Sequence, residues 1–301
     1  MSTDAAVSAQ NPPDERLAAI FANQRRWLLR MAAPARGVVA HAAGLTATCA
    51  RYDGAIVLPV GRPVSGAALD AAFDAIRRPA PPGGVLVWSA TGDEPLRTAL
   101  ARRLLARGCD EAFRPRWMER DLAATAESDA GHPAPDGFGV SPAESGDELA
   151  IAAAAEVGTP YASPHEATAL INHGRRPANR QRMWLLLARD RSDGRVVGQV
   201  AVNLTTGRRG IAGIYSMGVH PAVQRRGIGT ALIRAAADLA RQHGVASLGL
   251  NATPDGERLY RTLGFSVVTD GQTWHMPCRQ RVLLQPPTGT RWSSQRPSPA
   301  G

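Results

Sequence analysis

Two runs of β-branched and apolar residues in the second half of the chain predict an antiparallel hairpin. Residues 195–204 and 211–219 alternate in part between apolar and polar side chains, and Gly, Arg and Thr residues at 206–210 separate them. Apolar side chains then recur at helical spacing over residues 231–242, and Gly244 marks the end of this helix. The pattern therefore predicts strand, turn, strand and amphipathic helix in that order.

The next stretch predicts a shorter set of elements. Residues 246–250 form an apolar strand, a loop follows, and a short helix carrying Tyr260 ends at Gly264. Two further runs, 265–269 and 273–278, predict a final hairpin.

The first half of the chain resembles a weak copy of the second. Residues 86–93 parallel residues 248–255, and each stretch is followed by a predicted helix that ends at Gly108 or Gly264. Working backwards from residue 86, the pattern predicts the same element order as in the second half: a helix at 66–77, strands at 55–60 and 46–52, and a helix at 17–33. We therefore expect an α+β fold with a mixed sheet, in which a related, partial α/β half precedes the second half. An unrelated α/β domain with a chance similarity remains the alternative.

The turn between the strand at 211–219 and the following helix has the composition of a phosphate site. Gly227 and Gly229 allow close approach of a ligand to the backbone. The amides of residues 226–230 are unpaired at the positive end of the helix, and Arg225 and Arg226 add charge beside them. In the first half, residues 60–66 occupy this place without an Arg-Arg-Gly-x-Gly turn, so that half should not hold a pyrophosphate. We expect it to pack against the second half or to shape a substrate cleft there.

Three motifs in order resemble the acetyl-CoA site of the GNAT acetyltransferase superfamily. They are Val219-His220-Pro221, Gln224-Arg225-Arg226-Gly227-Ile228-Gly229 and Leu259-Tyr260-Arg261-Thr262-Leu263-Gly264-Phe265. The resemblance covers residues 148–277. It implies a C-terminal GNAT domain preceded by a degenerate, partial GNAT-like half, and an acetyl-CoA-dependent N-acetyltransferase that moves an acetyl group directly from the thioester to a primary amine of a small molecule or peptide.

The resemblance also implies roles for individual residues. The strand end at Met217 carries a bulge in the family, which Gly218 would ease, and a backbone amide there polarises the thioester carbonyl. Tyr260 is the implied acid that protonates the departing thiolate, since a phenol stays protonated at neutral pH. The implied cofactor-binding residues are Met217, Gly218, Val219, Arg225, Arg226, Gly227, Ile228, Gly229, Thr230 and Asn251.

The general base and the acceptor are not identified by the sequence. Many relatives place a Glu on the strand that here spans 211–219, and this strand has none. Residues 153–182 should cover the acceptor. Glu156 and Glu166 can pair with an ammonium group, or Arg175, Arg176, Arg180 and Arg182 attract an acidic acceptor or form a solvated face. The side chains that can approach the cleft as a base are Glu156, His165, Glu166, His220 and His275.

Length and composition set the domain plan. The 301 residues suit two domains. Polar and Pro-rich composition at both ends and in the middle predicts disordered tails and a linker. The expected division is a tail at 1–15, a degenerate GNAT-like domain at 16–129, a linker at 130–147, a GNAT domain at 148–280 and a tail at 281–301.

The net charge and the cysteines limit which partners, metals and cellular compartments we expect. The net charge is +9 and every basic residue is Arg, but the arginines are scattered, so nucleic acid is not expected as a partner. Cys49, Cys109 and Cys278 lack metal spacing, which indicates free thiols, a reducing compartment and no metal. There is no signal peptide and no apolar run long enough to span a membrane, so we expect a cytoplasmic monomer or homodimer. A catalytically inactive acyl-CoA-binding regulatory module is the alternative to an enzyme.

Overall fold

The structure is a computed structural model of the whole chain. It describes residues 15–32, 38–42, 44–49, 54–77, 81, 83–124, 134–151, 164–174, 176–177, 181–207 and 210–277. The two predicted tails lie outside the described residues, apart from Glu15, which begins the first helix.

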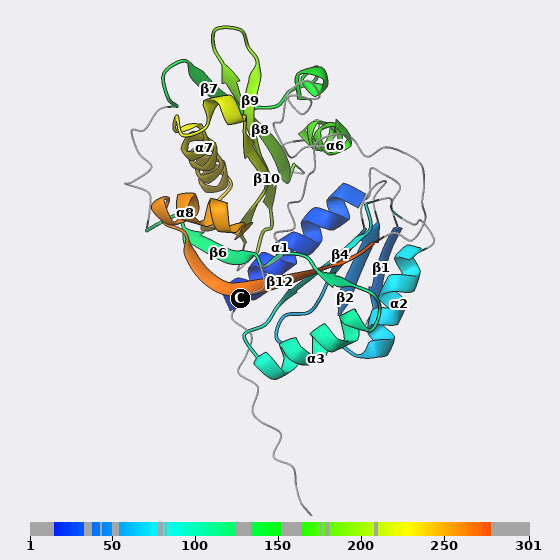
Figure 1. Cartoon of the computed structure of the whole chain (residues 1–301). Helices are drawn as coiled ribbons and strands as arrows, with labels where there is room; N and C mark the ends of the chain where they lie inside the picture. Colours follow the sequence, from blue (N-terminus) through cyan, green and yellow to red (C-terminus); the bar gives the residue numbers. More distant parts are fainter. Residues whose placement is uncertain are drawn as a thin grey trace, which may run out of the picture.

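The described residues form one twelve-stranded mixed sheet with helices on its faces (Figure 1). In the first half the elements are α1 Glu15–Ala32, β1 Val38–Ala42, β2 Leu45–Cys49, β3 Gly54–Val57, α2 Gly66–Arg77, β4 Val85–Ala90, α3 Glu94–Leu105, β5 Asp110–Glu111 and β6 Arg116–Asp121. In the second half they are β7 Phe138–Pro142, α6 Pro164–Gly174, β8 Met183–Asp190, β9 Val196–Leu204, β10 Ala212–Val219, a 3-10 turn Pro221–Val223, α7 Ile228–Gln242, β11 Ser247–Ala252, α8 Pro254–Thr262 and β12 Ser266–Met276.

The two halves repeat the same connection, as the sequence predicted. In each half an antiparallel pair of strands leads through a helix to a parallel neighbour: β2 and β3 through α2 to β4, and β9 and β10 through α7 to β11. Each parallel neighbour is followed by a helix with Pro in its first turn, α3 or α8. The mixed α+β architecture with a related first half is therefore confirmed.

The halves exchange strands, which the sequence analysis did not anticipate. The strand order is β1-β2-β3-β4-β12-β6-β11-β10-β9-β8-β7. Strand β6 of the first half pairs with β11 of the second, and the end of β12 pairs with β4 of the first. In Figure 1 the orange to red ribbon of β12 runs from α8 into the first half. Each half thus supplies a strand to the sheet of the other.

Two local predictions need correction. The final hairpin at 265–278 is wrong, because residues 266–276 form the single strand β12, whose beginning pairs with β6 and whose end pairs with β4. The range 130–147, predicted to be a linker, contains β7, which pairs antiparallel with β8 and extends the sheet. Its alternation covers only five residues, too few to stand out beside Pro and Gly.

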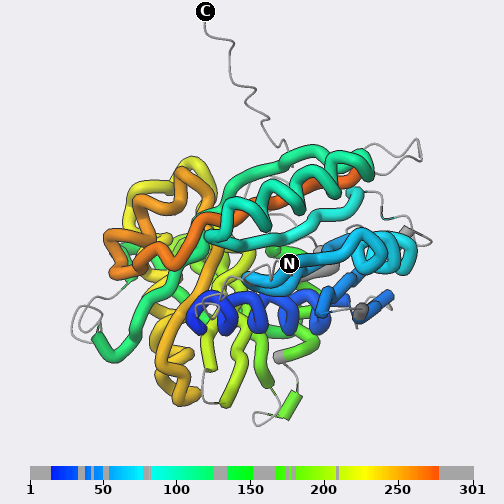
Figure 2. Tube along the Cα trace, turned by 90° about the horizontal axis from the view of Figure 1, so that it is seen from below, coloured from blue at the N-terminus to red at the C-terminus, as the bar shows by residue number. Residues whose placement is uncertain are grey.

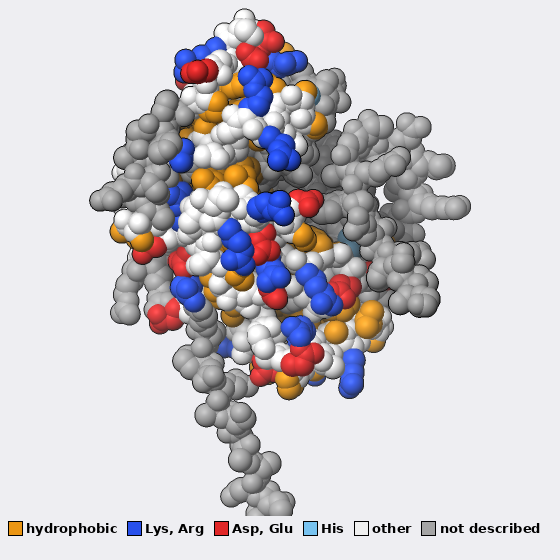
Figure 3. Space-filling view, turned by 60° about the vertical axis from the view of Figure 1, so that its left-hand side comes forward, with side chains coloured by type: hydrophobic (Ala, Val, Ile, Leu, Met, Phe, Trp, Pro, Cys, Tyr) orange, Lys and Arg blue, Asp and Glu red, His pale blue; other side chains and the backbone are white. Residues whose placement is uncertain are grey.

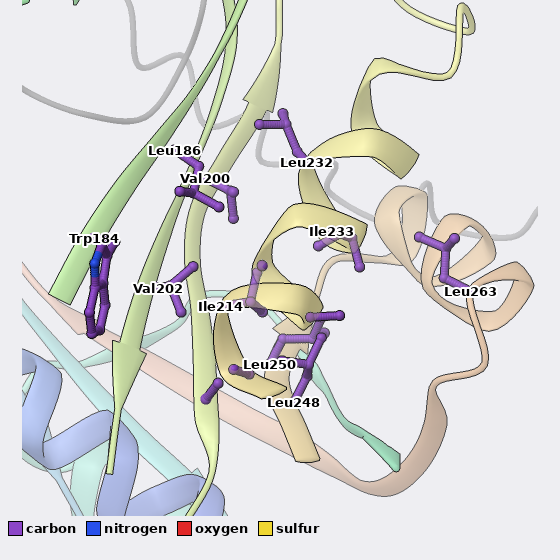
Figure 4. Close-up of a cluster of buried hydrophobic side chains, with 14 of the residues drawn as sticks. Trp184, Leu186, Val200, Val202, Ile214, Leu232, Ile233, Leu248, Leu250 and Leu263 are labelled. Atoms are coloured by element: carbon purple, nitrogen blue, oxygen red, sulfur yellow. The ribbon is translucent and has the colours of Figure 1, made fainter. Parts of the chain in front are cut away.

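The main core lies between α7 and the strands of the second half. In Figure 4, Leu232 and Ile233 of α7 face Val200, Val202, Ile214 and Leu248 on the strands. Each such side chain contributes about 1.5–3 kcal/mol when fully buried, so this packing fixes the start of α7 against the sheet.

The opposite face of the second half is covered by α6 and by α1 of the first half. Trp27 of α1 and Leu170 of α6 belong to one buried cluster with alternate residues of β8 and β9. Figure 2 shows α1, in dark blue, between the green and yellow strands of the second half and the cyan segments of the first. Among the described residues, no helix has both the length and the apolar content needed to cross a membrane.

Candidate functional site

Strands β10 and β11 form a fork that opens toward the Gly-rich turn. They pair in parallel only at Ala212–Leu248 and Gly213–Gly249. Beyond this point the pairing of β10 with β9 shifts between Tyr215 and Gly218, which marks a bulge. Backbone groups of β10 beyond the bulge therefore have no strand partner on the β11 side.

The bulge is held in place by unusual backbone geometry and by one buried side chain. Ser216 has a φ of 46°, in the left-handed region that non-glycine residues rarely adopt. The buried Gln199 of β9 donates from Nε2 to the Ser216 carbonyl at 3.5 Å. Gly198 approaches the Gly218 carbonyl closely: a Cβ at Gly198 would lie 3.1 Å from that oxygen.

The Gly-rich turn has the backbone shape of an anion site. Arg225 and Gly227 both have positive φ, 63° and 81°. The first main-chain bond of α7 runs from the Ala231 amide to the Gly227 carbonyl at 3.0 Å, so the amides of Ile228, Gly229 and Thr230 precede the helical ladder. The N-cap Gly227 offers no side-chain acceptor. Free amides at a helix N-terminus, on an exposed turn, favour a bound anion.

Gly229 lies where α7, β10 and α8 meet. A Cβ at this residue would lie 3.1 Å from Met217 Cε, 3.3 Å from Leu259 Cδ2 and 3.9 Å from Val219 Cγ2. A side chain here would press on the flexible ends of Met217 and Leu259, and the position brings the predicted strand segment 217–219 beside the start of α7.

Tyr260 reaches across the fork from α8 to the bulged strand. Its hydroxyl donates to Met217 Sδ at 3.4 Å, and its ring packs edge-on against Phe265 with centroids 5.5 Å apart. The side chain is half-buried. The structure thus brings Tyr260 to the bulge of β10 and the start of α7, although Tyr260 and Met217 lie 43 residues apart in the chain.

The two arginines of the turn have different surroundings. The Arg226 guanidinium lies 4.7 Å from the centre of the Phe138 ring, a cation–π contact with β7. Arg225 is exposed at the turn. On the face that Figure 3 shows, arginines and carboxylates are interspersed, without a continuous basic band.

The opposite side of the fork is closed by α1, a contact with no signal in the sequence. Gln24 of α1 lies close to Asn251 and Tyr215 of the fork, with no space between them large enough for a ligand. Gln24 is 3% exposed, and its Oε1 has no hydrogen-bond partner. Asn251, predicted on this strand end, thus faces α1 of the first half.

Asn23 of α1 joins the two halves through buried hydrogen bonds. Its Nδ2 donates to the carbonyls of Asn203 (2.9 Å) and Ile211 (2.8 Å), and its Oδ1 accepts from the Tyr215 hydroxyl (2.7 Å). Burial raises the pKa of Tyr215 above its ordinary value. The phenol therefore stays protonated and is unsuited to act as a base.

The other candidate bases remain unassigned. His220 Nδ1 accepts from the Ala222 amide at 3.2 Å, and His275 Nε2 lies 3.0 Å from the Gly83 carbonyl, beside the first half. Glu156 lies outside the described residues, and His165 and Glu166 belong to α6 with side chains outside the described part. Within the described ranges, no group of three or more His, Cys, Asp or Glu side chains is arranged to hold a metal ion.

Comparison with protein families agrees with this geometry. Residues 151–265 match the model of the acetyltransferase (GNAT) family, and the match spans the fork, the Gly-rich turn and Tyr260. The second half of the chain therefore carries a GNAT-family domain. A search of curated proteins finds no match to the chain.

Solved GNAT structures share the fold over most of the chain. A GCN5-related N-acetyltransferase from Kribbella flavida has a TM-score of 0.59 at 20% identity, covering 86% of this chain and 95% of its own. One from Sphaerobacter thermophilus has a TM-score of 0.53 at 20% identity, covering 80% and 79%. A tandem GNAT protein from the clavulanic acid biosynthesis pathway has a TM-score of 0.53 at 16% identity, covering 79% and 78%. The likeness extends over both halves, so the fold of the whole chain is shared with these structures.

Proposed function

We propose that the protein is an acetyl-CoA-dependent N-acetyltransferase, which moves an acetyl group directly to a primary amine of a small molecule or peptide. The observation that carries the proposal is the juxtaposition of the open fork, the uncapped start of α7 and the Tyr260 hydroxyl at Met217. The family match and the fold support it.

The residues present fit acetyl-CoA. The positive φ at Arg225 and Gly227 turns main-chain amides outward at the N-terminus of α7, and such a nest suits a diphosphate. Residues of the turn (Arg225, Arg226, Gly227, Ile228, Gly229 and Thr230) would hold the diphosphate. Met217, Gly218, Val219 and Asn251 would hold the pantetheine arm along the fork. Acetyl-CoA supplies the acetyl group and a thiol as leaving group.

The strand segment after the bulge is suited to polarise a carbonyl. Backbone N–H groups alternate in direction along a strand, so those of 217–219 that point away from β9 face the open side of the fork, where β11 pairs with β10 only as far as Gly213. A fixed amide donor beside developing negative charge contributes about 3–4 kcal/mol in comparable sites.

Tyr260 holds the proton that the departing thiolate needs. Its hydroxyl lies at Met217, next to the same amides, and a phenol keeps its proton at neutral pH. A positioned general acid contributes about 10²- to 10⁴-fold in rate. A covalent cysteine route has no support among the described residues, because Cys49 and Cys109 are buried in the first half.

The test is a thiol-release assay with acetyl-CoA and a panel of amines, beside calorimetry of acetyl-CoA binding. We expect saturable binding, and thiol release that depends on the amine with one acetyl group transferred per thiol. Tight binding without turnover on any amine would instead identify a non-catalytic acyl-CoA-binding module. Absence of binding would contradict the proposed phosphate site.

A further inference from the structure

A group of four arginines lies near the C-terminal part of α1, just after α6 and at the start of β8. They are Arg26, Arg30, Arg176 and Arg182. Arg26 and Arg30 lie one helical turn apart on α1. Arg30 Nη1 donates to the Leu204 carbonyl at 2.9 Å, and the Leu204 amide donates to the Arg182 carbonyl at 2.8 Å, so one residue of β9 joins both arginines. We call these four residues, together with His173, the arginine cluster.

His173 is the buried member of this cluster. It is 6% exposed on α6, its Nδ1 has no hydrogen-bond partner, and its carbonyl accepts from the Arg176 amide at 3.2 Å. Burial, together with the charges of Arg176 and Arg30, lowers the pKa of His173 to about 4. The imidazole is therefore neutral at pH 7, with one ring nitrogen unsatisfied.

The cluster has no carboxylate partner within the described part of the chain. Other partly buried arginines do have one: Arg107 pairs with Asp70 at 2.8 Å and Arg189 with Asp147 at 2.6 Å. Burial first, and then the charges of Arg26, Arg182 and Arg176, lower the pKa of Arg30 to about 10. Arg26 and Arg176 are exposed, whereas Arg30 and Arg182 are only partly exposed. Partly buried guanidinium groups without a counter-ion are costly, and a bound anion would lower that cost.

A merely solvated basic face does not account for this arrangement. Arg30 is only partly exposed and is fixed by hydrogen bonds to the Leu204 carbonyl and the Asn203 side chain. His173 is buried. Solvated arginine faces require neither an anchored guanidinium nor a buried imidazole with a free nitrogen.

The cluster is linked to the fork along α1. Trp27, one turn before Arg30, stacks on Tyr215 of β10 with ring centroids 4.4 Å apart and planes 7° from parallel. Tyr215 directly precedes Ser216 of the bulge. The cluster and the fork therefore share the face of the sheet that α1 and α6 cover.

We infer that the arginine cluster binds the carboxylate or phosphate of the acetyl acceptor, so that the substrate class is an amine carrying an anionic group. This rests on the proposed N-acetyltransferase function. The His173 imidazole supplies a neutral donor beside the guanidinium groups. The anion is held at the cluster while the amine extends toward the bulge of β10.

The first test compares matched amines in steady-state kinetics at constant ionic strength: an amino acid against its amide, and aminoethyl phosphate against ethanolamine. The double variant Arg176→Gln/Arg182→Gln should raise KM for the preferred anionic amine by at least about tenfold, which corresponds to about 1.4 kcal/mol. KM for its neutral partner and Kd for acetyl-CoA should not change. The control Arg97→Gln/Arg102→Gln makes the same change in net charge at exposed residues of α3 and should leave every constant as it is. The amino-acid and aminoethyl-phosphate arms decide between carboxylate and phosphate.

A binding measurement tests the cluster without turnover. With CoA saturating the Gly-rich turn, inorganic phosphate should raise Tm saturably in the wild type and in the control variant, but not in Arg176→Gln/Arg182→Gln. An equal rise of Tm in the control variant and in Arg176→Gln/Arg182→Gln would contradict the anion site. Equal KM values of the wild type for charged and neutral amines would also contradict it, while leaving acetyl transfer intact. Loss of acetyl-CoA binding in the wild type would instead refute the proposed function itself.

Discussion

The two halves of the chain use the same strand–helix–strand connection, but only the second half opens it. In the first half β3 and β4 pair at four successive positions, from Gly54–Val85 to Val57–Trp88, and the Leu58 amide continues the pairing to the Trp88 carbonyl at 3.1 Å. In the second half β10 and β11 pair at two positions and then part. The bulge of β10 is thus the local change that converts a closed sheet into a fork.

The helices that follow, α2 in the first half and α7 in the second, differ at their N-termini. At the start of α2 the Ser65 hydroxyl accepts from the Ala68 amide at 3.1 Å, and Arg103 donates to the Val64 carbonyl. At the start of α7 the N-cap is Gly227, with no side-chain acceptor. The start of α2 is therefore capped by a side chain, whereas the start of α7 has no side-chain cap.

The third difference concerns the side chain that faces the fork. Tyr260 lies four residues before Gly264, and four residues before Gly108 the first half has Leu104, which is fully buried. What remains at this place in the first half is a small hollow between residues 58–64 and α3. Three local changes thus separate a structural half from a half equipped for chemistry, while the exchanged strands make each depend on the other.

The largest effect should come from breaking the strand exchange. A chain ending at Asp270 lacks the part of β12 that pairs with β4 and β5. Because this removes a strand from the middle of the sheet, we expect both halves to lose cooperative unfolding in thermal circular dichroism. A chain ending at Arg279 keeps β12 and serves as the control. Normal unfolding of the shorter chain would show that the halves fold independently.

The second effect separates the two helix starts. Gly229→Glu places a carboxylate among Met217, Leu259 and Val219 and beside the free amides, so acetyl-CoA affinity should fall by at least about 100-fold, or about 2.7 kcal/mol. Gly66→Glu is the matched change at the start of α2, where the nearest neighbour is the flexible end of Arg107. It should leave affinity unchanged in calorimetry. Equal affinities of the two variants would place the diphosphate elsewhere.

The third effect concerns the hydroxyl that Leu104 lacks. Tyr260→Phe keeps the ring against Phe265 but removes the donor at Met217, so kcat should fall by about 100-fold with Kd for acetyl-CoA unchanged. Stopped-flow thiol release and calorimetry on the same preparation measure both quantities. Unaltered kcat would mean that Tyr260 only packs its helix.

The sequence predicted what depends on local pattern. The elements from β2 to α3 and from β9 to α8, the stop glycines and the Gly-rich turn follow from periodicity and turn chemistry over about 10–15 residues. Strands β1, β7 and β8 and helix α6 were not predicted. The resemblance then placed Tyr260 on the helix after the fork strand, and the structure brings its hydroxyl to the bulge.

What the sequence did not predict depends on partners far along the chain. Asp270-Gly271 has the composition of a hairpin turn, but β12 continues through it. The glycine has another role there: a side chain at Gly271 would collide with the Trp117 ring of β6. An alternating strand has the same pattern whichever strand it pairs with, so the exchange left no local signal. The roles of Asn23 and Gln24 of α1 were not predicted either, because their neighbours lie in the second half of the chain.

The smallest effect tests how far the first half supports the fork of the second. Asn23→Leu leaves the buried Tyr215 hydroxyl and the Asn203 amide without the Asn23 Oδ1 acceptor, so the free energy of unfolding should fall by about 2 kcal/mol in urea titrations. Gln242→Leu, at the exposed end of α7, should change it by less than about 0.5 kcal/mol. Because Asn23 belongs to the first half and its partners to the second, the loss should appear as one shifted transition rather than two. A separate early transition in only one half would show that α1 lies against the fork without stabilising it.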